Sequence, residues 1–470
     1  MKWWTMILAG VLVAACSNDK PEEGDASVTT QASADTQPED PNLWMEEVEG
    51  ERALAWVREQ NERSLAGLTA QPVYEDNLSK AMALAVSDDR IPYGTIRDGY
   101  VYNFWQDATN VRGLWRRTPV DSYLADDAEW EAVLDFDALA AQEDKNWVFK
   151  GADCFRPAGA ERTLCLVSLS DGGKDAVVLR EFDLQSKTFV ADGFVTPEAK
   201  QGSAWIDQDT LLIATDWGGD GSTLTESGYP SDVRLWRRGE SLDYAESVYT
   251  GDATDVGVWP WSNELDSGEM IYGAVEADTF FTRTFWLTTG DEPQAFPLPP
   301  KANLDDRLDG YQFVTLQQDW SVQGQEFRSG DLVTFELAAF LDSGTLPPVE
   351  LVFRANDRQA VNGVAVAKGA ALLSINDNVA SRLLLLSRGD DGWQTEDIDL
   401  PGTGQASIYF SDAREDTVFV NYEGFLTPDT LLAYSAATGN MSPIKSLPAK
   451  FDADGLSVSQ FQAVSKDGTR

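Results

Sequence analysis

The sequence predicts an all-β fold, a seven-bladed β-propeller preceded by a short helical segment. From about residue 75 onward, short β-type runs alternate with turns rich in Asp, Gly, Asn and Ser, and long helical periods are missing. Related motifs recur at intervals of about 50 residues, the length that four short strands and their turns require. A two-sheet sandwich is the alternative, but sandwiches rarely carry seven evenly spaced copies of one motif.

Residues 1–15 are predicted to be a signal peptide. Lys2 precedes an apolar run from Met6 to Val13, which is too short to span a membrane permanently. The next residues, Ala14-Ala15-Cys16, complete a motif similar to a bacterial lipobox, in which the cysteine is acylated and becomes the mature N-terminus. We therefore predict lipidation at Cys16. The alternative is an ordinary secretory signal that happens to contain a cysteine.

Residues 16–40 are predicted to be a flexible acidic tether that starts at the lipobox cysteine. Residues 17–40 carry seven acidic side chains and one lysine, and Val28 is their only large apolar residue, so burial cannot offset the entropy of ordering this segment. In lipoproteins of this kind, Ser17 after the cysteine implies the outer membrane. The predicted location is the periplasmic face of the bacterial outer membrane, contacted through the lipid anchor only. A soluble periplasmic or secreted protein is the alternative.

Residues 41–74 are predicted to form an N-terminal helical segment. The stretch Ala53–Leu65 places Leu54, Val57 and Leu65 on one face at helical spacing. The propeller is predicted to follow directly, over residues 75–458.

Two repeated motifs support the propeller. Leu114-Trp115-Arg116-Arg117 recurs as Leu235-Trp236-Arg237-Arg238, and weaker copies bring the total to seven, centred near residues 115, 182, 236, 286, 335, 385 and 433. Asp209-Thr210-Leu211-Leu212-Ile213 recurs 207 residues later as Asp416-Thr417-Val418-Phe419-Val420, which is four units of about 52 residues. Each unit has the size of one blade.

The cysteine content is consistent with an exported protein. Besides Cys16, the chain contains only Cys154 and Cys165. Trp147–Phe149 and Leu164–Leu169 read as two strands around a turn, so a hairpin could bring the two sulfur atoms together. The oxidising periplasm permits such a disulfide. Two buried free thiols are the alternative, and counting thiols under denaturing conditions separates the two.

The charge and composition exclude several functions. The chain has 36 basic and 78 acidic side chains, a net charge of −42, so it repels phosphate backbones and we predict no nucleic-acid partner. It contains no histidine, which excludes a Ser-His-Asp or Cys-His triad within these residues. Two Asp-rich stretches, Asp305–Gly310 and Asp452–Gly455, offer the oxygen atoms that calcium prefers. Both lack the twelve-residue loop with its closing glutamate, so we interpret them as solvated turns and predict no metal site.

A second set of motifs runs through the chain in a fixed order. Asp40-Pro41 is followed by Trp44-Met45-Glu46-Glu47-Val48 and then by Ala53–Asn61. Further motifs follow: Phe104-Trp105-Gln106-Asp107, Ser227-Gly228-Tyr229-Pro230 and Phe425-Leu426-Thr427-Pro428. This order resembles the prolyl oligopeptidase family of serine peptidases, and the resemblance covers about residues 40–470.

The resemblance implies an enzyme that hydrolyses short peptides, with the propeller over the active site selecting substrates by size. Val464–Arg470 is similar to the strand and tight turn that open the family's α/β-hydrolase domain, so residues 459–470 are predicted to be the start of a truncated domain. The rest of that catalytic domain is absent from this chain, and no Gly-x-Ser-x-Gly nucleophile elbow is present. We therefore assign no catalytic residue and expect no cofactor.

Two functions follow from this resemblance. In the first, the chain is the N-terminal gating propeller of a serine-type endopeptidase, and its partners are short peptides in the propeller channel and the missing α/β-hydrolase domain. In the second, it is a stand-alone lipid-anchored propeller that binds a peptide or protein without catalysis. Both predict that the 470-residue chain alone hydrolyses no peptide.

Overall fold

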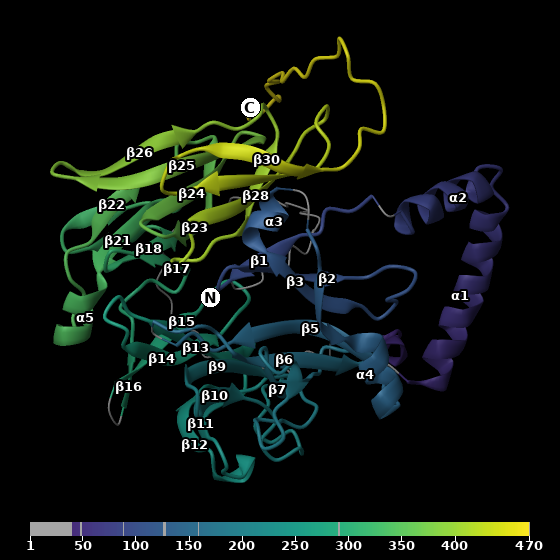
Figure 1. Ribbon diagram of the computed structural model, residues 1–470, viewed down its shortest axis with the longest axis horizontal. Coiled ribbons are helices and arrows are strands. Elements are labelled where there is room, and N and C mark those ends of the chain that lie inside the picture. Colours follow the sequence, from purple (N-terminus) through teal and green to yellow (C-terminus); the bar gives the residue numbers. More distant parts are fainter. Residues whose placement is uncertain are drawn as a thin grey trace, which may run out of the picture. The chain divides into compact units, whose positions relative to one another are not determined.

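The structure is a computed structural model that describes residues 40–47, 49–87, 89–125, 128–157, 159–289 and 292–469 (Figure 1). The predicted signal peptide, the predicted lipidation site Cys16 and all of the tether except Asp40 lie outside these residues. The chain divides into two compact units, Met1–Ser87 and Asp88–Arg470.

The first unit is helical in its described residues. It contains a 3-10 helix, η1 (Leu43–Glu46), and two α-helices, α1 (Glu51–Thr69) and α2 (Tyr74–Ala85). The indole rings of Trp44 and Trp56 meet edge to face with their centroids 6.4 Å apart. This aromatic contact joins η1 to α1.

Helix α2 moves the expected domain boundary. The helical segment was expected to end at residue 74, but α2 continues it to Ala85. The first turn of α2 is acidic, and Lys80 pairs with Asp76 one turn away at 2.7 Å; both features stabilise a helix. The first propeller strand therefore begins at Gly94 and not near residue 75.

The second unit contains seven four-stranded sheets, and each is an antiparallel meander of strands that follow one another in the chain. Sheets one to three consist of β1 (Gly94–Arg97), β2 (Tyr100–Trp105), β3 (Leu114–Pro119), β4 (Glu131–Asp135); β5 (Trp147–Cys154), β6 (Leu164–Asp171), β7 (Val178–Asp183), β8 (Thr188–Phe189); and β9 (Gly202–Asp207), β10 (Thr210–Ala214), β11 (Asp232–Arg237), β12 (Glu246–Thr250). Sheets four and five consist of β13 (Gly257–Glu264), β14 (Met270–Ala277), β15 (Thr284–Thr289), β16 (Glu292–Ala295); and β17 (Ala302–Leu308), β18 (Tyr311–Leu316), β21 (Leu332–Glu336), β22 (Glu350–Phe353). Sheets six and seven consist of β23 (Gln359–Ala367), β24 (Ala370–Asp377), β25 (Ala380–Gly389), β26 (Gly392–Ile398); and β27 (Gln405–Phe410), β28 (Thr417–Glu423), β29 (Thr430–Ser435), β30 (Met441–Ser446).

Short elements occupy the connections between these strands. A hairpin of β19 (Trp320–Val322) and β20 (Gln325–Phe327) is inserted in sheet five. The helices are α3 (Val120–Leu124), α4 (Phe136–Glu143), η2 (Leu242–Tyr244) and α5 (Leu337–Ser343). Asp135 caps α4, because its carboxylate accepts a hydrogen bond from the Ala138 backbone N–H at 2.9 Å.

The sequence repeat coincides with the blades. The seven expected centres lie in the third strands of the seven sheets, namely β3, β7, β11, β15, β21, β25 and β29. The second motif, at Asp209–Ile213 and Asp416–Val420, falls on the second strands β10 and β28. The prediction of a seven-bladed β-propeller is therefore confirmed.

Seven hydrophobic clusters lie between neighbouring sheets. Between sheets one and two, for example, the rings of Trp115 and Phe182 lie 6.0 Å apart. The cluster between sheets seven and one, here called the seam cluster, has as its buried residues Ile91, Ile96, Val101, Tyr123, Phe410, Phe419 and Leu431. Within the described ranges, sheets one and seven share no strand, so side chains and not a β-ladder join the ends of the ring there.

The segment after β30 contains no strand among residues 447–469. It ends in a tight turn, in which the Ser465 N–H donates to the Thr469 carbonyl at 2.8 Å and Gly468 has a φ of +87°. The expected turn is therefore present, whereas the expected strand at Val464 is not. A strand needs a neighbour to satisfy its backbone groups, and the described residues offer none there.

Candidate functional site

The first strands of the sheets surround the axis of the propeller, and the fourth strands lie outermost (Figure 1). Each blade is a meander running in the same direction, so the connections between first and second strands lie together at one end of the channel. We call this the first-turn end. The connections between second and third strands lie at the opposite, second-turn end, where the chain also enters sheet one and leaves sheet seven.

Ion pairs cross the channel at the first-turn end. Arg414, between β27 and β28, pairs with Glu264 at the end of β13. Sheets four and seven are separated by two sheets on one side and three on the other, so a direct contact between them must span the axis. Arg414 also donates a hydrogen bond from Nη1 to the carbonyl oxygen of Pro157, in sheet two, at 3.1 Å.

A second group of contacts joins sheet two to sheets one and seven. Arg156 donates from Nη2 to Oδ1 of Asp412 at 2.7 Å, and Arg162 Nη1 lies 3.3 Å from Oδ2 of the same carboxylate. The Arg162 backbone N–H donates to Asp98, in the first hairpin, at 2.9 Å. Together with Glu415, which lies 4.0 Å from Arg162, these residues form what we call the cross-channel network: Asp98, Arg156, Arg162, Glu264, Asp412, Arg414 and Glu415.

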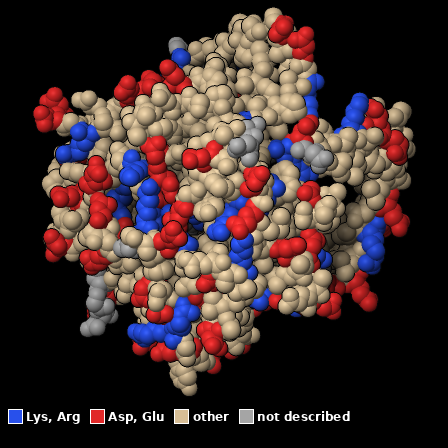
Figure 2. All heavy atoms as spheres, in the orientation of Figure 1, with Lys and Arg blue, Asp and Glu red and all other residues tan. Residues whose placement is uncertain are grey.

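The cross-channel network is largely buried. The side chains of Arg162 and Asp412 are only 5% and 8% exposed. Burial by itself would raise the pKa of Asp412, but Arg156 and Arg162 hold that pKa below its usual value. Burial and the neighbouring Asp412 raise the pKa of Glu415. The network combines three arginines with four carboxylates. On the visible face of the molecule, acidic side chains are likewise interspersed with basic ones (Figure 2).

The structure joins the sulfur atoms of Cys154 and Cys165 in a disulfide. The two residues are direct cross-strand partners at the ends of β5 and β6. The disulfide therefore closes the base of the hairpin that carries Arg156 and Arg162 to the cross-channel network.

We expect the disulfide to stabilise the fold. Closing a loop of this length, with a sequence separation of 11 residues, is worth about 3 kcal/mol by restricting the unfolded chain. A reductant should therefore lower the wild-type free energy of unfolding by roughly this amount, measured by urea denaturation. The Cys154→Ser/Cys165→Ser variant should show no response to the reductant. Two free thiols from this pair in unreduced, denatured protein would contradict the expectation.

The Asp-rich stretch 305–310 differs from the expected solvated turn. Asp305 and Asp306 lie within β17, and only Asp309-Gly310 forms the turn. Asp305 Oδ2 accepts a hydrogen bond from the Thr315 hydroxyl at 2.6 Å, and Asp306 Oδ2 accepts one from the Val366 N–H at 3.2 Å. Burial raises the pKa of Asp305 to about 7. Both carboxylates therefore belong to the packed contact between sheets five and six.

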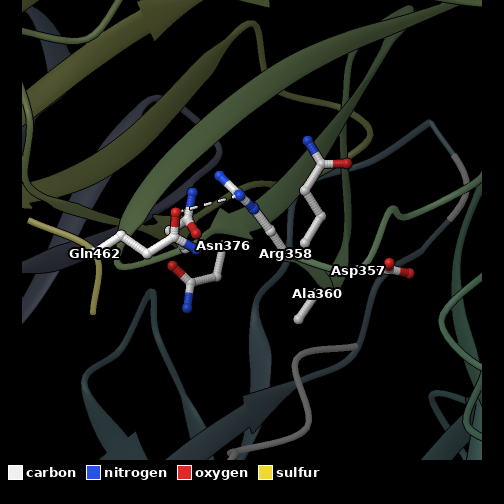
Figure 3. Close-up of a pocket in the computed structure, with 7 residues that line it drawn as sticks. Asp357, Arg358, Ala360, Asn376 and Gln462 are labelled. Carbon is white, nitrogen blue, oxygen red and sulfur yellow. Dashed lines mark hydrogen bonds between the residues drawn. The ribbon is translucent and has the colours of Figure 1, made fainter. Parts of the chain in front are cut away.

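A polar pocket of about 730 Å³ lies at the beginning of β23 (Figure 3). Its lining residues are Asp357, Arg358, Gln359, Ala360, Asn376, Asn378 and Gln462. Arg358 makes a long hydrogen bond of 3.5 Å to Gln462 of the C-terminal segment, and the buried Oδ1 of Asn376 has no hydrogen-bond donor among the described residues. Amides and a guanidinium are groups that bind peptide backbone and carboxylate. The pocket faces the second-turn end, because Asn378 lies in the turn between β24 and β25.

No metal-binding cluster is assembled in the described part of the chain. Within it, no group of three or more acidic or cysteine side chains is placed to hold a metal ion. The helices described there are also too short or too polar to cross a lipid bilayer. What the site does provide is a ring with one end bridged by ion pairs and the other carrying a polar pocket.

Residues 21–447 match the family described as "Prolyl oligopeptidase, N-terminal beta-propeller domain". The chain belongs to the prolyl oligopeptidase family. An uncharacterized peptidase of Sinorhizobium fredii is 37% identical over 444 residues, which cover 92% of this chain and 60% of that protein. A post-proline cleaving enzyme from Rickettsia typhi matches in structure with a TM-score of 0.80 at 26% identity, covering 90% of this chain and 63% of the other.

More distant family members share the propeller fold. Prolyl oligopeptidase B from Galerina marginata superposes with a TM-score of 0.67 at 16% identity and covers 92% of this chain and 60% of its own. The present chain thus spans about 60% of the length of the curated relatives it matches. Sequence reasoning identified the family and the cysteine pair but not the cross-channel network. Its partners are as much as 256 residues apart in the sequence, and no local pattern marks them.

Proposed function

We propose that this chain is the substrate-gating propeller of a serine-type oligopeptidase that hydrolyses short peptides. In the complete protein, a catalytic domain supplied by the remaining length of the relatives would cover the second-turn end. The propeller would then restrict the active site to peptides small enough to reach it. We further propose that the complete protein is exported and held at the outer membrane through a lipid on Cys16.

The distribution of exposed apolar side chains carries this proposal. Five large apolar side chains in connections at the second-turn end are each more than 60% exposed: Val111, Phe280, Phe281, Val379 and Phe425. Among the described residues of the propeller, Tyr244 is the only comparably exposed one in a connection at the first-turn end. A domain docked on this end would remove these side chains from water, which is favourable for apolar groups. The second-turn end is therefore the face that fits a docked domain.

The experiment begins with the DNA downstream of the Arg470 codon. We expect a reading frame that adds a serine nucleophile elbow, then an aspartate and a histidine. The complete protein should hydrolyse a short chromogenic peptide and leave a folded protein of the same cleavage sequence intact, measured by absorbance and by gel electrophoresis. The 470-residue chain alone should hydrolyse neither.

Three outcomes would contradict the proposal. Hydrolysis of the peptide by the 470-residue chain alone would place catalysis in the propeller. Equal cleavage of the folded protein and the short peptide by the complete enzyme would remove the gating role. A reproducible stop codon without such a reading frame would favour a stand-alone propeller. The polar pocket at the beginning of β23 would then be the candidate peptide-binding surface.

A further inference from the structure

In the part of the chain that the structure describes, the ring of seven sheets is held closed without a shared strand. Each sheet is built only from strands that follow one another, so no backbone ladder joins sheet seven to sheet one. Packing in the seam cluster is nonpolar and involves neighbouring sheets only. A contact from sheet seven to a sheet beyond sheet one therefore links parts of the ring that the seam cluster does not join.

We propose that the cross-channel network is a latch that keeps the propeller ring closed and takes the place of a shared strand. Arg414 of sheet seven reaches Glu264 in sheet four and the Pro157 carbonyl in sheet two. Asp412 of sheet seven accepts two arginines from sheet two. Opening the ring at the seam would separate sheet seven from sheet two and break the contacts of Asp412 and of the Pro157 carbonyl together.

The burial of the latch makes it effective. Ion pairs on an open surface contribute little, because water and salt screen them. In the latch, Arg162 and Asp412 are almost completely buried, and Arg414 and Glu264 are 29% and 19% exposed. Removing one partner leaves a buried charge without compensation, which is costly. The disulfide at the base of the hairpin holds Arg156 and Arg162 close to their carboxylate partner.

Hydrogen exchange on the 470-residue chain tests the latch, because it reports opening sheet by sheet. The variants Glu264→Gln and Arg414→Gln should exchange amides in sheets one and seven about tenfold faster than wild type, with sheets five and six unchanged. The milder variant Arg414→Lys keeps the positive charge but loses the planar guanidinium that contacts both Glu264 and the Pro157 carbonyl. It should therefore show the same pattern of faster exchange with a smaller effect. The charge swap Glu264→Arg/Arg414→Glu should restore slow exchange only in part, because a carboxylate at position 414 cannot donate to the Pro157 carbonyl.

A matched control is the ion pair between Arg382 and Asp397, which lies within sheet six at 2.7 Å. Arg382→Gln should leave exchange in sheets one and seven at the wild-type rate. The proposal is overturned if the folded Glu264 and Arg414 variants exchange like wild type at these sheets. It is also overturned if exchange accelerates equally in all seven sheets, or if the control reproduces the effect.

Discussion

Replacing Phe419 by alanine is expected to lower the free energy of unfolding by about 3–5 kcal/mol, the cost of removing a fully buried phenylalanine. Phe419 lies on β28 with no exposed surface, and its ring lies 5.6 Å from Tyr123 and 5.9 Å from Phe410. Tyr123 belongs to α3 of the first blade, so the substitution opens a cavity across the seam. Among the described residues, no strand is shared between sheets one and seven, so no backbone ladder limits this loss of stability.

Phe425 offers a matched control in the same blade. It is 84% exposed, so Phe425→Ala should change stability by less than about 0.5 kcal/mol. Urea denaturation followed by tryptophan fluorescence measures both variants. Equal effects of the two substitutions, or a loss below about 1 kcal/mol for Phe419→Ala, would show that the seam cluster does not hold the ring.

The second large effect is a loss of stability as the pH rises toward 7, caused by Asp305. Burial raises its pKa from 3.8 to about 7 in the folded protein. Between pH 4 and 7 the folded state therefore keeps a proton that the unfolded chain has released, and the free energy of unfolding falls as the pH increases. At about 1.4 kcal/mol per pKa unit, the contribution of this one group reaches ~4 kcal/mol at most.

Asp305→Asn should remove this part of the pH dependence, because the amide is neutral at every pH in the range. The Thr315 hydroxyl, which donates to Asp305 Oδ2, can rotate and accept from the amide instead. Thermal unfolding at intervals from pH 5 to 8 should give a flatter profile for the variant, with the difference from wild type growing toward pH 8. Other carboxyls with raised pKa values, such as Asp255, are present in both proteins, so their contributions cancel in the difference between the two stability profiles. Parallel profiles for the two would disprove the assignment.

The repeat could be predicted from sequence because each blade is a local structure. Four consecutive strands bring their own turns and their own apolar alternation, so the third strands at residues 115, 236 and 433 stand out without tertiary information. The cysteine pair could be found for the same reason, since Cys154 and Cys165 face each other across one hairpin.

Features that depend on distant partners could not be predicted in this way. Asp305 and Asp306 looked like a turn, but a register shift between Leu304 and Arg307 lets β17 continue through them, and the next sheet partly covers them. Arg162 and Asp412 meet only because a ring of seven blades brings the last blade back near the first two. The end of the helical segment was misplaced because α2 and the propeller strands both start from short amphipathic runs.

The use of consecutive strands in every sheet has a consequence for synthesis on the ribosome. Each blade can form as soon as about 50 residues have emerged, without waiting for later sequence. One face of the first blade must nevertheless wait for later sequence. Its residues Val101 and Tyr123 pack against Phe419 and Leu431, which are translated only some 300 residues later. During that interval its apolar face is exposed, so we expect nascent chains that stall before β27 to be the species that chaperones bind and that aggregate.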